Sequence, residues 1–140
     1  MEILEQNEAY IVCVKPVGVP AQGEGENAMP VRLAAEVGGE IYPVHRLDQA
    51  VGGVMVYART KQAAAALSCA IQEGRMEKEY LAVLTKPMAE PCGTLRDLLY
   101  HDRVKNKTYV VKRKRNGVKE AVLDYETLAS GAEGTLIHVH

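Results

Sequence analysis

Phenylalanine and tryptophan are absent from the sequence, and seven tyrosines supply its aromatic residues. Valine, leucine, isoleucine, alanine and methionine must therefore build the core, with tyrosine at its rim or in functional sites, where each hydroxyl needs a polar partner. A long apolar run is also missing, which excludes a membrane-spanning helix. With 140 residues, of which 47% are hydrophobic and 25% charged, the chain has the size and composition of one globular domain.

Cysteine is scarce, and its three copies are widely spaced. Cys13, Cys69 and Cys92 form no Cys-x-x-Cys pair, so the sequence indicates neither a disulfide framework nor a zinc site. We expect them to be small apolar residues in a reducing compartment. His138 and His140 would share one face of a strand, but no nearby residue completes a set of metal ligands, and we expect no bound metal.

A signal peptide and an excess of one charge sign are missing too. The acidic start, Met1 to Glu5, lacks the basic and apolar segments of a signal peptide, which makes the cytoplasm the expected location. The net charge is only -1, yet residues 1–45 carry seven acids and two bases, whereas residues 101–120 carry eight bases and two acids. Such a local basic patch can hold phosphates although the whole chain is nearly neutral.

The patterning predicts an α+β fold with a mixed, mainly antiparallel sheet and flanking helices. One helix is expected over residues 29–37, ended by Gly38-Gly39, and a second follows Thr60 as its N-cap and ends at Gly74. Strands are expected over residues 10–14, 53–58, 79–85 and 134–140. The strand at 53–58 is almost continuously apolar, which predicts burial on both faces.

Asn116-Gly117 is the clearest local turn signal, because this pair suits the two positive-φ positions of a type I′ turn. The flanking segments, residues 107–115 and 118–128, are therefore predicted to form a β-hairpin. Its tip would carry four adjacent cations: Lys112, Arg113, Lys114 and Arg115. These cations suit either a solvated turn without a function or an arm that contacts RNA phosphates.

The segment from residue 44 to 53 is the strongest candidate for a functional site. It places Asp48 between Arg46 and the pair Gly52-Gly53, directly before an apolar strand. Loops at strand ends are well placed to act on a ligand. Taken alone, however, Asp48 can equally cap a turn and pair with Arg46.

The order of motifs along the chain resembles the RluA-type family of RNA pseudouridine synthases. Lys15-Pro16-x-Gly18 is followed by His45-Arg46-Leu47-Asp48, by Gly53, by an alanine-rich helix and by a strand that contains Tyr80. The resemblance runs from about residue 10 to residue 128, and the His-Arg-Leu-Asp box is its most specific part. It implies the pseudouridine synthase catalytic fold, without a separate N-terminal RNA-binding domain.

Members of that family isomerise uridine in ribosomal or transfer RNA. They cleave the N-glycosidic bond, turn the uracil and rejoin it through carbon, with no metal or cofactor. The resemblance implies that Asp48 is the nucleophile and that Tyr80 lies against the target base as a candidate general base. Arg46 would fill the space left by the extruded base or hold the RNA backbone. His45, Lys15 and the four cations at 112–115 are the other candidate RNA contacts.

The sequence departs from the family at two places. Val51-Gly52 stands where the family usually has Thr-Ser, so two hydroxyls that would tie the loop are missing and we expect a less rigid loop. The family's domain also continues past residue 140 into a basic segment that pairs with the catalytic Asp. We therefore expect residues 1–140 to be an incomplete catalytic domain, weakly active or inactive alone, and prone to self-association through an exposed strand edge.

Two other classes of function stay open at this point. A degenerate relative would keep the fold and bind RNA without catalysis. A small metabolic hydrolase would use Asp48 as its nucleophile, but neither the basic residues nor the absence of a phosphate-binding loop favours it.

Overall fold

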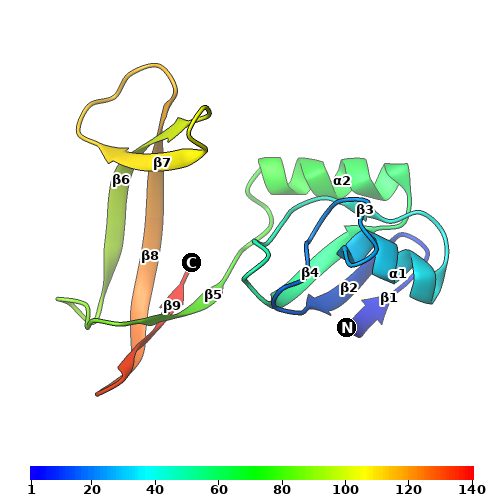
Figure 1. The fold of residues 1–140 in the computed structure, drawn as a ribbon, viewed down its shortest axis with the longest axis horizontal. Helices are drawn as coiled ribbons and strands as arrows, with labels where there is room; N and C mark the ends of the chain where they lie inside the picture. Colours follow the sequence, from blue (N-terminus) through cyan, green and yellow to red (C-terminus); the bar gives the residue numbers. More distant parts are fainter. The chain divides into compact units, whose positions relative to one another are not determined.

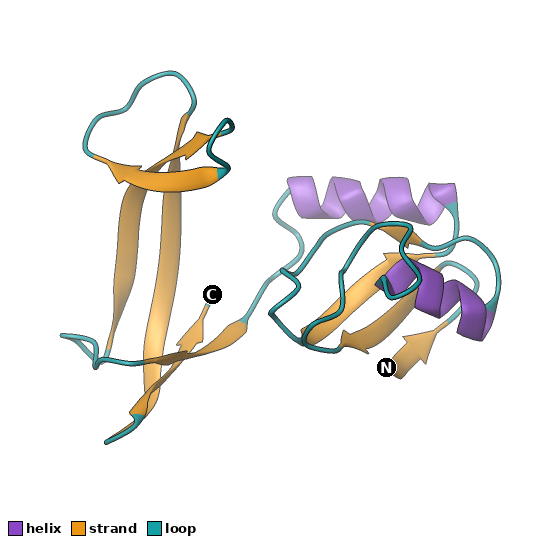
Figure 2. Ribbon diagram, in the orientation of Figure 1, coloured by secondary structure: helices purple, strands orange, loops and turns teal.

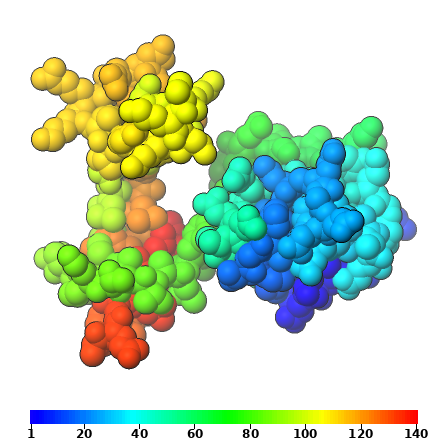
Figure 3. All heavy atoms as spheres, in the orientation of Figure 1, coloured from blue at the N-terminus to red at the C-terminus, as the bar shows by residue number.

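The computed structural model describes residues 1–140 and divides the chain into two compact units, Met1–Met76 and Glu77–His140. Figure 1 shows the elements of both units, and Figure 3 shows their atoms in the same sequence colours. Each unit has its own antiparallel sheet, and both helices belong to the first unit. This α+β composition confirms the predicted fold class.

Unit 1 contains a four-stranded antiparallel sheet in the order β1-β2-β4-β3 and the two helices, drawn in purple in Figure 2. Its elements are β1 (Glu2–Gln6), β2 (Tyr10–Lys15), α1 (Met29–Val37), β3 (Tyr42–Pro43), β4 (Gly53–Ala58) and α2 (Lys61–Gln72). The predictions of β2, β4 and both helices are confirmed. Strands β1 and β3 were not expected from the sequence.

The core of unit 1 follows from the register of its central strands. Cys13 of β2 lies opposite Met55 of β4, and Ile11 lies opposite Tyr57, so these four side chains share one face of the sheet. All four are buried, and Leu33 of α1 packs against them. Tyr57 is thus a core residue rather than a rim residue. Its hydroxyl donates a hydrogen bond to the Ala21 carbonyl over 2.8 Å, and burial raises its pKa.

The residues at the ends of both helices determine where the helices begin and end, as the sequence predicts. Thr60 accepts a hydrogen bond from the Ala63 amide over 3.1 Å and so caps α2, and Gly74 takes a positive φ of 70° just beyond its end. Gly38 ends α1 with a φ of 72°. The expectation for β4 is wrong in one respect, because Val54 is 60% exposed and the strand is not buried on both faces.

Unit 2 is a five-stranded antiparallel sheet in the order β5-β9-β8-β6-β7. Its strands are β5 (Tyr80–Leu84), β6 (Cys92–Asp102), β7 (Lys107–Val111), β8 (Val118–Gly131) and β9 (Gly134–Val139). Tyr125, Ile137 and Val139 form a small buried core. Long ladders between neighbouring strands therefore hold much of this unit together.

The predicted hairpin at Asn116-Gly117 is wrong. Strands β7 and β8 flank this pair, but they do not pair with each other, because β6 lies between them and pairs with both. Asn116 has no positive φ, so a type I′ turn does not form. The hairpin lies instead between β6 and β7. In its turn Asn106 has a φ of 47°, and the Asp102 carboxylate accepts hydrogen bonds from the Val104 and Lys105 amides. The long ladder between β6 and β8 therefore outweighs the preference of Asn116-Gly117 for a hairpin turn.

The last strand is not at an edge of its sheet, which corrects a second expectation. β9 pairs with β5 on one side and with β8 on the other. His140, the residue after it, exchanges two backbone hydrogen bonds with Asp124, at 2.9 and 3.0 Å. The edges of this sheet are β5 and β7.

The cysteines differ in their surroundings. Cys13 is buried, and burial raises the pKa of its thiol to about 11. Cys69 and Cys92 are exposed. All three thiols are free. No helix in the structure combines the length and the apolar character that crossing a membrane requires.

Gly134 provides a test of the packing between β5 and β9. A Cβ atom at this residue would lie 2.8 Å from the Leu84 carbonyl oxygen and 3.1 Å from a Val83 methyl group. We expect Gly134→Ala to lower the free energy of unfolding by about 1–3 kcal/mol, measured by urea unfolding of the full chain. Gly131→Ala is the matched control, because its Cβ would meet no atom within 4 Å. Equal midpoints for the two variants would contradict this packing.

Candidate active site

The loop between β3 and β4 carries the His-Arg-Leu-Asp box, and Leu47 anchors it. Leu47 packs against the core of unit 1, whereas the side chains of Arg46 and Asp48 are 64% and 80% exposed. Leu47 is therefore turned toward the core, and the side chains before and after it are turned toward solvent. Gly53, the first residue of β4, takes a φ of 153°, which side chains rarely adopt, and it lies next to a Leu47 methyl group.

Arg46 and Asp48 form a charged pair in the loop. The Arg46 Nη2 atom lies 3.5 Å from the Asp48 Oδ1 atom. Such a long and exposed contact contributes little to stability. Its consequence is chemical, because it places a positive charge beside a carboxylate that is open to an approaching molecule.

Lys15 ties this loop to the turn that follows β2. Its side chain is fully buried, and its Nζ atom donates to the carbonyls of Pro16 at 3.0 Å, Val19 at 2.7 Å and Gln49 at 3.3 Å. Burial lowers the pKa of this ammonium group. The three carbonyls use its three N–H donors, which contradicts the expectation that Lys15 contacts RNA.

Two hydrogen bonds between Gly18 and Gln49 complete the connection between turn and loop, and a third lies within the loop. The Gly18 amide donates to the Gln49 carbonyl over 2.8 Å, and the Gln49 side-chain amide donates back to the Gly18 carbonyl over 2.9 Å. The Val51 amide donates to the Asp48 carbonyl over 3.0 Å. Gly52 lies so close to the turn that a Cβ would be 3.1 Å from a Val17 methyl group. These contacts hold the loop without the two hydroxyls that the family usually has.

His45 holds the other end of the loop. Its Nε2 atom accepts a hydrogen bond from the Val56 amide over 3.2 Å. Strand β3 ends at Pro43, so the His45 ring supplies an acceptor to β4 beyond the last paired residue. A ring nitrogen accepts only in its deprotonated form, which requires the proton of a neutral ring to be on Nδ1. The structure therefore uses His45 to position the loop.

Tyr80 belongs to the other unit. It is the first residue of β5, lies opposite Val139 and is 41% exposed. Asp48 and Tyr80 thus come from different units, and each is placed within its own. Next to Tyr80, Glu79 lies 3.3 Å from the His138 ring. The sequence did not predict this pair, because its members are 59 residues apart and no local pattern connects them.

The four cations at 112–115 lie on the exposed loop between β7 and β8 rather than at the tip of a hairpin. None of them forms an ion pair in the structure. Arg115 lies over the Tyr100 ring, with its Cζ atom 4.7 Å from the ring centroid. The loop therefore presents a compact positive charge to solvent.

Comparisons with known proteins point to one family. A family model described as RNA pseudouridylate synthase matches residues 9–140. A tRNA pseudouridine synthase C from Vibrio parahaemolyticus is 30% identical over 90 residues, which cover 60% of this chain and 36% of that protein. An RNA pseudouridine synthase 7 from Oryza sativa subsp. japonica is 38% identical over 82 residues, which cover 55% of this chain and 21% of that protein. The chain thus matches less than half the length of these curated relatives.

Two solved human structures share the fold. RNA pseudouridylate synthase domain containing 1 superposes with a TM-score of 0.81 at 19% identity, and domain containing 4 with a TM-score of 0.79 at 23% identity. Each match covers 99% of this chain, and 58% and 57% of the respective solved chains. At these identities the likeness concerns the fold alone.

Replacing Lys15 tests how the loop is held. Lys15→Met keeps an unbranched side chain but leaves three carbonyls without their donor, so we expect a loss of about 1–3 kcal/mol in the free energy of unfolding. Amide hydrogen exchange at Gly18 and Val51 should become faster, because the turn and the loop lose their shared donor. Lys61→Met, at an exposed lysine of α2, is the control. Unchanged stability and unchanged exchange in Lys15→Met would contradict this role.

Proposed function

Because the chain belongs to the RNA pseudouridylate synthase family, we propose that it isomerises specific uridines of structured RNA to pseudouridine, with Asp48 as the nucleophile. The observation that carries this proposal is the loop geometry. Leu47 is anchored in the core, the Asp48 side chain is 80% exposed, and the Arg46 guanidinium lies 3.5 Å from its carboxylate. This arrangement offers a positioned carboxylate to an incoming substrate.

The chemistry begins when an Asp48 carboxylate oxygen attacks the sugar or assists its deprotonation. Either route breaks the N-glycosidic bond, and the uracil leaves with the bonding electron pair. The base then turns and rejoins the sugar through carbon. In the first route the new bond displaces the Asp48 carboxylate, and in the second route Asp48 returns to the sugar the proton that it took. In both routes a proton is left to be removed from the base carbon that forms the new bond. The reaction is thereby divided into two easier steps.

Tyr80 and Arg46 have supporting roles in this proposal. Tyr80 offers a ring for contact with the uracil and a hydroxyl for proton transfer, and it is the candidate general base. A uridine inside a base stack is out of reach of Asp48, so it must be extruded, at a cost of a few kcal/mol. Arg46, exposed beside Asp48, would fill the vacated space or hold the backbone.

RNA is the proposed partner, and we assign both units to one catalytic domain because the family match spans residues 9–140. The loop at 112–115 supplies phosphate contacts. The cytoplasmic location and a reaction without metal or cofactor stay predictions. A metabolic hydrolase has no support from the family match.

Asp48→Asn tests the nucleophile. We expect pseudouridine formation to fall by about three orders of magnitude or more, because an amide does not replace the carboxylate as a nucleophile. RNA affinity should stay within about twofold, since the two side chains are nearly equal in size. The rejoining through carbon displaces a base hydrogen, so release of tritium from labelled uridine measures the reaction.

Asp97→Asn, at an exposed acid of β6, is the control. Full activity in Asp48→Asn would overturn the assignment, and RNA binding without product by the unaltered chain would favour the noncatalytic relative.

Neutralising the basic loop tests the phosphate contacts. Replacing all four cations at 112–115 by Gln should reduce the slope of log affinity against log salt by about 0.7–0.9 for each phosphate that the loop no longer neutralises. Affinity for RNA is measured by titration at several salt concentrations. The control neutralises four exposed cations elsewhere: Lys61, Arg75, Lys78 and Lys86. An unchanged slope in the loop variant would show that the loop is only a solvated turn.

A further inference from the structure

The hairpin of β6 and β7 brings two tyrosines together on one face. Tyr100 and Tyr109 are directly opposite each other in the register of these strands. Side chains in such a pair leave the same face of the sheet, with Cβ atoms about 4.5–5.5 Å apart. Tyr109 is 37% exposed and Tyr100 is half-buried. Neither belongs to the buried core of unit 2, and neither has a role in the proposed reaction.

A cation accompanies each of the two rings. The Arg115 guanidinium lies 4.7 Å from the Tyr100 centroid, and the Lys107 ammonium lies 5.7 Å from the Tyr109 centroid. Cations attract phosphate, and the flat guanidinium of arginine also stacks on bases. We call these four residues, Tyr100, Lys107, Tyr109 and Arg115, the tyrosine platform. They lie in or next to the most basic stretch of the chain, residues 101–120.

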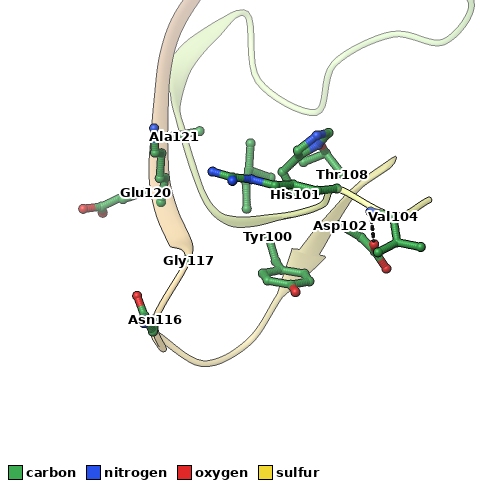
Figure 4. Close-up of a pocket in the computed structure, with 12 residues that line it drawn as sticks. Tyr100, His101, Asp102, Val104, Thr108, Asn116, Gly117, Glu120 and Ala121 are labelled. Atoms are coloured by element: carbon green, nitrogen blue, oxygen red, sulfur yellow. Dashed lines mark hydrogen bonds between the residues drawn. The ribbon is translucent and has the colours of Figure 1, made fainter. Parts of the chain in front are cut away.

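A hollow of about 890 Å³ adjoins the platform. It is lined by Tyr100, by the turn after β6, and by residues 116, 117 and 119–121 (Figure 4). Its volume falls within the range of small-molecule sites. Gly117 lies beside this ring and takes a φ of 82°, which favours glycine. The space beside Tyr100 is therefore large enough for a flat group.

We propose that the tyrosine platform binds unpaired nucleotides of the RNA, with bases stacked on Tyr100 and Tyr109 and phosphates met by Lys107 and Arg115. The proposal rests on the proposed function, which makes RNA the partner. Aromatic rings bind single strands with little sequence preference, because every base has a π-face. A double helix hides these faces inside its own stack. The platform thus selects single-stranded segments, and it belongs to unit 2, whereas the Asp48 loop belongs to unit 1.

A tryptophan in place of Tyr100 makes the stacking directly observable. The chain has no other tryptophan, so Tyr100→Trp yields one fluorescent reporter that keeps a flat ring. A single-stranded oligouridine of about ten nucleotides should quench this fluorescence, and a blunt RNA duplex of equal length should not. Tyr42→Trp, in unit 1, is the control and should respond to neither RNA. No quenching at oligouridine concentrations that saturate binding would overturn the proposal.

Removal of the rings gives a second, independent measurement. Tyr100→Leu and Tyr109→Leu should each weaken oligouridine binding about tenfold, whereas the corresponding Phe variants should bind like the unaltered chain. Tyr42→Leu is the control, and circular dichroism checks that each variant folds. If a Leu variant does not fold, the fluorescence result decides.

Equal affinity of folded Leu variants would overturn the platform and leave the proposed function intact, because that function is tested by product formation with Asp48→Asn. Failure of the unaltered chain to bind oligouridine would overturn the platform as well.

Discussion

The burial of the Lys15 ammonium group is the constraint on which the loop with the His-Arg-Leu-Asp box depends. An ammonium group taken out of water must be matched by acceptors. Here the carbonyls of Pro16, Val19 and Gln49 match it, at 2.7–3.3 Å. Those carbonyls belong to the turn after β2 and to the loop after β3, so satisfying one charge joins two segments that are distant in sequence. Leu47 can then remain in the core while Asp48 faces outward.

Unit 2 is held together in a different way from unit 1. Its core contains few buried side chains, and its order comes from five antiparallel strands, whose register shifts once, between Thr127 and Ala129 of β8. The register also decides which side chains meet on the surface, since it sets Tyr100 opposite Tyr109 and leaves the basic loop at the end of the same hairpin. Positive charge and exposed tyrosine rings thus lie close together in a unit that has only a small buried core.

Local signals predicted the elements whose ends depend on neighbouring residues. Thr60 caps α2 and Gly38 ends α1, as the sequence indicates. The strongest local turn signal, Asn116-Gly117, failed because β6 pairs with both flanking strands. Strand β6 itself was missed, because Pro87, Pro91 and Gly93 suggested a break and its apolar residues do not alternate regularly.

By itself, the sequence determined the fold class, both helices, the family resemblance and the candidate role of Asp48, because these rest on motifs and preferences that span a few residues. Only the tertiary structure decided that Lys15 is buried, that His45 supports β4, that β9 lies inside its sheet and that Tyr100 meets Tyr109. The physical reason is the range of the interactions. Burial of a charge and pairing of strands join residues far apart in the chain, and they override a local preference worth about 1 kcal/mol.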